Sequence, residues 1–97
     1  MQPCKRIEIV VEEPLLRRML AALAEIGVPG YTVIRGVSGR GDRGERRGDD
    51  VTNVFTNCLV IIACDAQLAT QVADVVRPVL SASGGVCIVS DAQWLRH

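Results

Sequence analysis

The residues best suited to chemistry lie in one polar stretch, residues 38–50, which contains four glycines and no apolar side chain. Arginine guanidinium groups supply forked donors for phosphate, and glycines let backbone N–H groups approach an anion closely. The arginines of this stretch are Arg40, Arg43, Arg46 and Arg47. We therefore expect an anion-binding segment here. A solvated hairpin tip with balanced charges is the alternative interpretation.

A second glycine cluster lies in residues 81–85 and contains Ser83, Gly84 and Gly85. Such a run can present N–H groups to a phosphate, and it can equally form a plain turn between a helix and a strand. Taken with the first cluster, it favours recognition of a phosphate-bearing ligand.

Catalytic chemistry lacks its usual groups in this sequence. The only histidine is the terminal His97, so a general base or an activated nucleophile has no evident partner. Four cysteines are present without CxxC spacing, and we expect them to be buried, reduced thiols. They are Cys4, Cys58, Cys64 and Cys87. A binding protein that is not an enzyme is the expectation, with soft-metal binding by the cysteines as an alternative.

The hydrophobic pattern predicts the elements that must position these clusters. Strands are expected over residues 5–11, 31–37, 57–64 and 86–89. One helix should run from Pro14 to the region of Gly27, and a second should follow Asp65 and end by Pro78 and the second glycine cluster. The order is that of an α+β ferredoxin-like βαββαβ sandwich, in which two helices cover one face of the sheet.

This order makes the polar stretch a long connection between the second and third strands, and such structureless connections are uncommon in compact domains. The third strand, residues 57–64, is apolar on both of its faces. Because the helices cover only one face of the sheet, self-association over the open face would hide the remaining apolar side chains, Val10 among them.

Bulk properties narrow the class of protein. The chain of 97 residues is expected to be a single domain, residues 1–97, and its 11 basic residues balance 11 acidic ones. That balance removes the general attraction that a nucleic-acid or membrane-surface binder needs. Glu8, Glu12 and Glu13 interrupt the apolar residues near the start, so we expect a cytoplasmic protein without membrane insertion.

The two βαβ halves and the polar loop resemble the PII signalling superfamily over most of the chain. The second strand of that family carries G-x-T-V, matched here by Gly30, Thr32 and Val33, and its long T-loop starts near a G-x-G-R motif, matched to residues 37–40. Residues 48–57 (GDDVTNVFTN) also resemble the return limb of this loop in the carboxysome-associated PII-like branch, which is linked to inorganic-carbon handling.

The resemblance implies a homotrimer whose sheets face inward, with nucleotide sites in the clefts between subunits and a T-loop at about residues 38–53. It places Thr32 and Ile62 near the adenine, with Val33 also in the nucleotide site. It places Gly39, Arg40 and Gly41 at the phosphates, with Ser83, Gly84 and Gly85 in a second phosphate-facing loop. It brings Arg96 to a neighbour's nucleotide, and it leaves Arg43, Glu45, Arg46 and Arg47 to bind a protein partner.

Three departures from the family pattern change which ligands and which modification we expect. Gly41 stands where nitrogen-signalling members have a glutamine that helps bind magnesium and 2-oxoglutarate, so that ligand is not expected. No tyrosine lies in the loop, which excludes tyrosyl uridylylation. Val86 and Cys87 follow the second cluster where the family has a lysine, and the missing cation favours ADP or AMP over ATP.

The sequence thus predicts a regulator that binds ADP or AMP, with bicarbonate beside the nucleotide as in the carboxysome-linked branch. Its T-loop would dock on a carbon-uptake protein such as a bicarbonate transporter. The alternative is a metal-binding or metal-tolerance trimer of ferredoxin-like fold that uses its cysteines, and a weak nucleotide hydrolase is the least favoured of the three.

Overall fold

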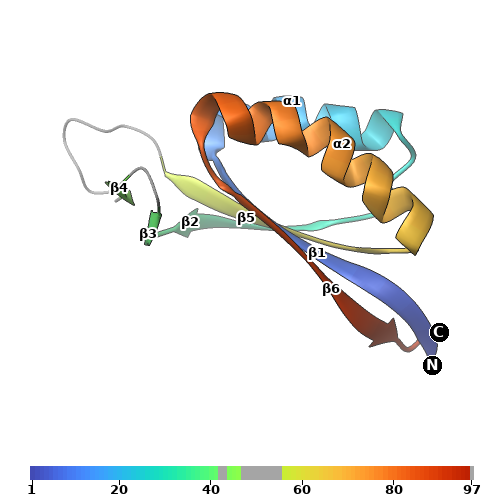
Figure 1. The fold of residues 1–97 in the computed structure, drawn as a ribbon. Coiled ribbons are helices and arrows are strands. Elements are labelled where there is room, and N and C mark those ends of the chain that lie inside the picture. The colour runs from blue at the N-terminus through green and yellow to red at the C-terminus, as the bar shows by residue number, and fades with distance from the viewer. Residues whose placement is uncertain (42–43, 47–55, 97) are drawn as a thin grey trace.

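A computed structural model describes residues 1–41, 44–46 and 56–96 of the chain. Its elements are β1 (Gln2–Glu12), α1 (Glu13–Glu25), β2 (Thr32–Val37), β3 (Gly39–Gly41), β4 (Gly44–Arg46), β5 (Asn57–Cys64), α2 (Ala66–Ser83) and β6 (Val86–Trp94). Four strands form an antiparallel sheet in the order β2-β5-β1-β6, and both helices lie on one of its faces (Figure 1). The predicted α+β order of four strands and two helices is confirmed.

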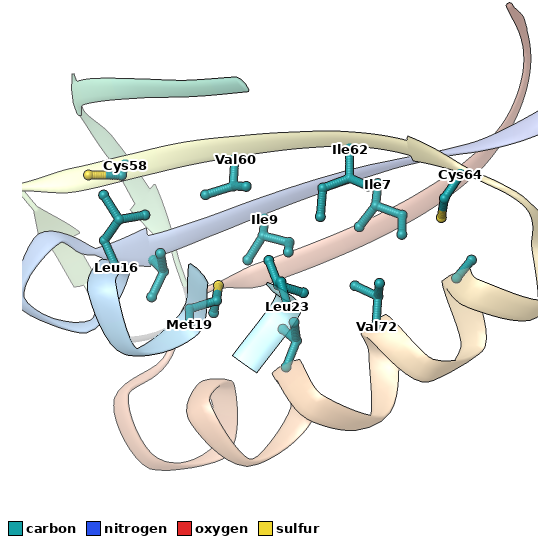
Figure 2. Packing of buried hydrophobic residues seen from close by; sticks show 13 residues of the cluster. Ile7, Ile9, Leu16, Met19, Leu23, Cys58, Val60, Ile62, Cys64 and Val72 are labelled. Atoms are coloured by element: carbon teal, nitrogen blue, oxygen red, sulfur yellow. The ribbon is translucent and has the colours of Figure 1, made fainter. Parts of the chain in front are cut away.

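The core lies between the helices and one face of the sheet (Figure 2). Alternate residues of β1 point into it, and the register sets Ile7 beside Ile62 and Ile9 beside Val60 of β5. The helices contribute Leu16, Met19, Leu23, Ala69, Val72 and Val76, all of which are buried. Because the second layer covers only this face, every apolar residue on the opposite face stays accessible in a single chain.

Strand β6 extends well beyond its hydrophobic pattern. Strand β6 was expected over residues 86–89, but it continues to Trp94, where it pairs with Gln2 of β1. The polar residues Ser90 and Asp91 hide this continuation, since main-chain pairing needs no apolar side chain. Helix α2 continues past Pro78 and ends at Ser83, at the glycine cluster that was expected to close it.

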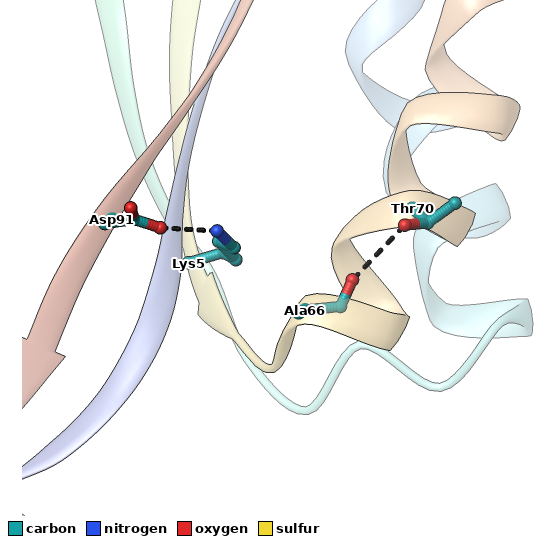
Figure 3. A network of polar contacts seen from close by, with 4 residues as sticks. All are labelled: Lys5, Ala66, Thr70 and Asp91. Atoms are coloured by element: carbon teal, nitrogen blue, oxygen red, sulfur yellow. Dashed lines mark hydrogen bonds and ion pairs between the residues drawn. The ribbon is translucent and has the colours of Figure 1, made fainter.

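Polar contacts link β1 to β6 and stabilise the start of α2. Lys5 of β1 forms an ion pair with Asp91 of β6, and the Thr70 hydroxyl donates to the Ala66 carbonyl in the first turn of α2 at 3.3 Å (Figure 3). The carboxylate of Asp65 accepts from the Leu68 N–H at 2.7 Å, so Asp65 is the N-cap of α2, as predicted.

The start of the polar stretch is more regular than the sequence indicated. Strands β3 and β4 pair as a short hairpin in which Gly39 lies opposite Arg46 and Gly41 opposite Gly44. The expectation of a connection without secondary structure therefore fails for these residues. Glycine-rich segments can still pair through their main chains, which a hydrophobic pattern does not register. The partner-binding residues expected at Arg43 and Arg47 lie outside the described residues.

Candidate functional site

The turn that ends α2 has a backbone conformation that favours glycine. Gly84 has φ 81° and ψ −179°, a conformation essentially restricted to glycine, and its N–H donates to the Leu80 carbonyl at 2.8 Å. The Ser83 hydroxyl donates to the Val79 carbonyl at 2.8 Å, one turn earlier in the helix. The serine expected to face a phosphate thus has its hydroxyl proton engaged by the helix.

Gly85 has an even stronger structural reason to be glycine. Its φ is 121°, and a Cβ at this position would lie 2.4 Å from the main-chain oxygen of Val10 and 2.9 Å from Cδ2 of Leu80. The turn before β6 therefore packs directly against the end of β1. This requirement holds whether or not the turn also contacts a ligand.

The segment that we expect to form the T-loop begins after a bulge at the end of β2. Arg35 pairs with Cys58, but Val37 pairs with Asn57, and Gly36 between them has φ 74°. The chain then enters β3 at Gly39, where no heavy atom of the described residues lies within 4 Å of the place that a Cβ would occupy. The described structure thus gives Gly39 no packing reason to lack a side chain.

The two glycine clusters lie at the same end of the sheet (Figure 1). Strand β6 begins opposite Val10, and β2 ends beside Asn57, which pairs with Glu12 two residues further along β1. We define the T-loop base as Gly39, Arg40 and Gly41, where the T-loop is expected to start. This base therefore shares one end of the molecule with the turn of Ser83, Gly84 and Gly85. This juxtaposition follows from strand order and register, which the sequence pattern alone does not give.

The adenine residues expected on the strands divide between the two faces of the sheet. Thr32 is exposed on the open face, opposite the helices, where its neighbour in β5 is Ile61. Val33 points the other way and packs partly buried against the core. Ile62 is only 1% exposed within that core, so its side chain offers no surface to a ligand. Ile61 is instead the β5 residue that shares a face with Thr32.

Arg96 lies at the opposite end of the molecule from the glycine clusters. It follows β6, whose nine residues at about 3.3 Å each span roughly 27–30 Å from the glycine turn. Its guanidinium carbon lies 4.2 Å from the centroid of the Trp94 ring, and the Trp94 Nε1–H donates to Oε1 of Gln2 at 3.2 Å. In one chain, Arg96 and the glycine turn cannot meet the same nucleotide.

Sequence reasoning missed a polar cluster beside the T-loop base. The Glu13 carboxylate accepts from Nη1 of Arg35 at 2.9 Å and from Oγ1 of Thr56 at 2.6 Å, and the Glu13 N–H donates to the Thr56 carbonyl at 2.7 Å. The Thr56 hydrogen bond, together with the charge and hydrogen bond of Arg35, lowers the pKa of Glu13. The acid at the helix start was the only signal in the sequence, because its two partners lie far along the chain.

The open face of the sheet carries a row of apolar residues near the T-loop end. Ile34, Leu59, Val10 and Val86 lie side by side across all four strands. Ile34 is 46% exposed and Val86 is 44% exposed, and Ile88 in the next row is 53% exposed. In a single chain these side chains face water, an arrangement typical of an association surface.

The cysteines behave as packing residues in the described part of the chain. All four thiols are free, and burial raises the pKa of Cys58, Cys64 and Cys87. The described residues include no group of three or more His, Cys, Asp or Glu side chains that could hold a metal ion. No helix in the described ranges is long and apolar enough to cross a membrane.

Comparisons with solved structures identify close likenesses of this fold. CPII from Thiomonas intermedia, a nitrogen regulatory PII-like protein bound to ADP, AMP and bicarbonate, is 29% identical with a TM-score of 0.87, covering 97% of this chain and 90% of that chain. The apo form of CPII is 27% identical with a TM-score of 0.81, covering 98% and 95%.

A putative PII-like signaling protein from Thermus thermophilus shares the fold at 21% identity and a TM-score of 0.74, with 94% of this chain and 88% of that chain covered. No curated protein matches the sequence. The family model of the nitrogen regulatory protein P-II matches residues 4–97. Because this match spans nearly the whole chain, the protein belongs to the P-II family, whose members are regulatory proteins and not enzymes.

Proposed function

We propose that this protein is a cytoplasmic homotrimeric regulator that binds ADP or AMP, with bicarbonate as a further ligand, in clefts between its subunits. Its T-loop, at about residues 38–53, would transmit the bound state to a protein of inorganic-carbon uptake. The bound ADP, AMP and bicarbonate of CPII support the ligand class. The resemblance of residues 48–57 to the carboxysome-associated branch supports the pathway.

One observation carries the assignment to an intersubunit site. The T-loop base and the glycine turn occupy one end of the sheet, whereas Arg96 follows the far end of β6, roughly 27–30 Å away. A nucleotide that touches both the base and Arg96 must therefore receive Arg96 from a second copy. The exposed apolar row of Ile34, Leu59, Val10 and Val86 supplies a surface on which copies can associate.

The chemistry of the proposed site suits a small number of phosphates. Arg40 adds a forked cation at the T-loop base, whereas Val86 and Cys87 follow the glycine turn where the family has a lysine. Cys87 packs against the core, and burial raises the pKa of its thiol, so it adds no charge to the site. With that cation missing, we expect ADP or AMP to bind more tightly than ATP in calorimetric titrations.

Subunit mixing tests the proposal directly. Arg40→Ala should weaken ADP binding roughly ten- to a hundredfold, the cost of one charged hydrogen bond to phosphate, and Arg96→Ala should also weaken it. Arg46→Ala with Arg47→Ala is the matched control and should change the ADP affinity little.

When the Arg40→Ala and Arg96→Ala proteins are unfolded together and reassembled, each mixed trimer should contain one site with both arginines. Random mixing then restores about one quarter of the wild-type number of tight sites, since three quarters of the trimers are mixed. Tight binding that never returns on mixing would place both arginines in one chain and overturn the intersubunit site.

A further inference from the structure

The first turn of α1 is joined to the chain that returns from the T-loop. A helix start leaves four N–H groups without intrahelical partners, and that of Glu13 donates to the Thr56 carbonyl at 2.7 Å. Thr56 immediately precedes β5, so it belongs to the return limb of the loop. The start of α1 is therefore capped in part by a residue 43 positions later in the sequence.

The side chain of Glu13 contacts both limbs of the loop. Oε2 accepts from the Thr56 hydroxyl at 2.6 Å on the return limb, while Oε1 accepts from Nη1 of Arg35 at 2.9 Å on the outgoing limb. Arg35 directly precedes the bulge at Gly36, where β2 departs from its regular pairing with β5. One carboxylate thus bridges the two limbs at the level where they leave the sheet.

We propose that Glu13 is a positioning residue for the T-loop base. By holding Arg35 and Thr56 together, it fixes the direction in which the chain continues to Gly39 and Arg40, four and five residues beyond Arg35. Without this bridge, the limbs are held together only by main-chain pairing of β2 with β5, and nucleotide binding must then supply more of the ordering free energy. The inference rests on the proposed function, because it assumes that the base contacts the ligand's phosphates.

The test compares ADP affinity in a set of matched variants. Glu13→Ala removes both side-chain contacts but keeps the backbone bond to Thr56, and we expect the Kd for ADP to rise about three- to tenfold. Thr56→Val should give part of this loss and Thr56→Ser almost none, because serine restores the hydroxyl. The Glu13→Ala, Thr56→Val double variant should bind no more weakly than Glu13→Ala alone, since both changes remove the same contact.

Asp91→Asn is the matched control, because it removes another ion-paired carboxylate, which lies on β6 and pairs with Lys5 far from the loop. We expect it to bind ADP like the wild type. An unchanged Kd in Glu13→Ala, or the same loss in Asp91→Asn, would overturn the positioning role.

Hydrogen exchange of the nucleotide-free protein separates this inference from the proposed function. Glu13→Ala should speed amide exchange about threefold or more in peptides covering residues 33–41 and 56–60, with no change in residues 86–94. If the wild-type protein fails to bind ADP but this exchange pattern appears, the proposed function fails and the bridge stands. Unchanged exchange in both limbs would remove the bridge itself.

Discussion

Replacing Gly85 by alanine tests whether the second glycine cluster is required by the fold. The new Cβ would lie 2.4 Å from the Val10 carbonyl oxygen, a main-chain atom that cannot rotate away, and the backbone has φ 121°. Adoption of this backbone region by alanine costs about 1–3 kcal/mol, and overpacking adds about 1–3 kcal/mol. The free energy of unfolding should therefore fall by roughly 2–6 kcal/mol.

Gly39→Ala is the matched change in the first cluster. No heavy atom of the described residues lies within 4 Å of its Cβ position, and its φ is not in the left-handed region. Alanine at a compatible backbone position typically adds about 0.4–1 kcal/mol of stability by restricting the unfolded chain. We therefore expect the nucleotide-free Gly39→Ala protein to be at least as stable as the wild type and yet to bind ADP more weakly, because a methyl group obstructs the approach of phosphate to the main chain.

Thermal unfolding followed by circular dichroism, at equal protomer concentration with and without ADP, measures both effects. For a domain of this size, each kcal/mol shifts Tm by about 4–8 °C, so Gly85→Ala should melt at least about 8 °C below the wild type. A Gly85→Ala protein that melts within about 2 °C of the wild type would refute the packing argument. The glycines of the turn would then need a ligand to explain them.

Four further predictions follow from the structure. Ile61→Asp on the open face should convert the proposed trimer into monomers, as measured by light scattering, while the helical circular dichroism is retained. Glu13 and Asp91 each accept a hydrogen bond and form an ion pair, which lowers their pKa values below the ordinary 4.5 and 3.8. The stability that the two carboxylates add is therefore present above these ordinary pKa values and is lost as the pH falls below them. The urea midpoint should accordingly fall as the pH drops below about 4, and less so in Asp91→Asn. Because burial raises the pKa of the Cys58 thiol, it should react with a disulfide reagent only after unfolding. Leu23→Ala in the core should lower the free energy of unfolding by about 2–5 kcal/mol in urea titrations.

The elements of the fold were predictable where side chains alternate between water and the core. Ile7, Ile9 and Val11 alternate along one face of β1, and all three are buried in the core. The second half of β6 was not predictable in this way, because its pairing with β1 is made by main-chain groups and passes through the polar Ser90 and Asp91. Periodicity indicates burial, whereas pairing also requires a partner strand that the local sequence does not specify.

The face assignment in β5 shows a different limit of sequence reasoning. Leu59 and Ile61 alternate with Val60 and Ile62, so the strand is apolar on both faces and its pattern cannot say which set meets the helices. Only the register with Ile7 and Ile9 of β1 resolves the choice, and it places Ile62 in the core. The Ile62 side chain therefore faces the core, so the predicted place of Ile62 near the adenine stays a prediction that only its main chain could fulfil.

The Glu13 bridge could not be read from the sequence, because its members come from three separate segments. Glu13 begins α1, Arg35 ends the regular part of β2, and Thr56 precedes β5. Each is an ordinary polar residue at its own position, where an acid at a helix start already has a sufficient explanation in the helix dipole. Long-range contacts of this kind depend on strand order and register, so they appear only when the sheet is assembled.

The two glycine clusters look alike in the sequence but differ in what the fold demands of them. Gly84 and Gly85 have backbone conformations that other residues rarely adopt, and the turn they form packs on β1. Gly39 has neither constraint from the described residues. A glycine that the fold requires says little about a ligand, since it would be retained without one. Gly39 is therefore the better indicator of where a phosphate approaches the main chain, and it lies beside Arg40, the cation that such a phosphate would need.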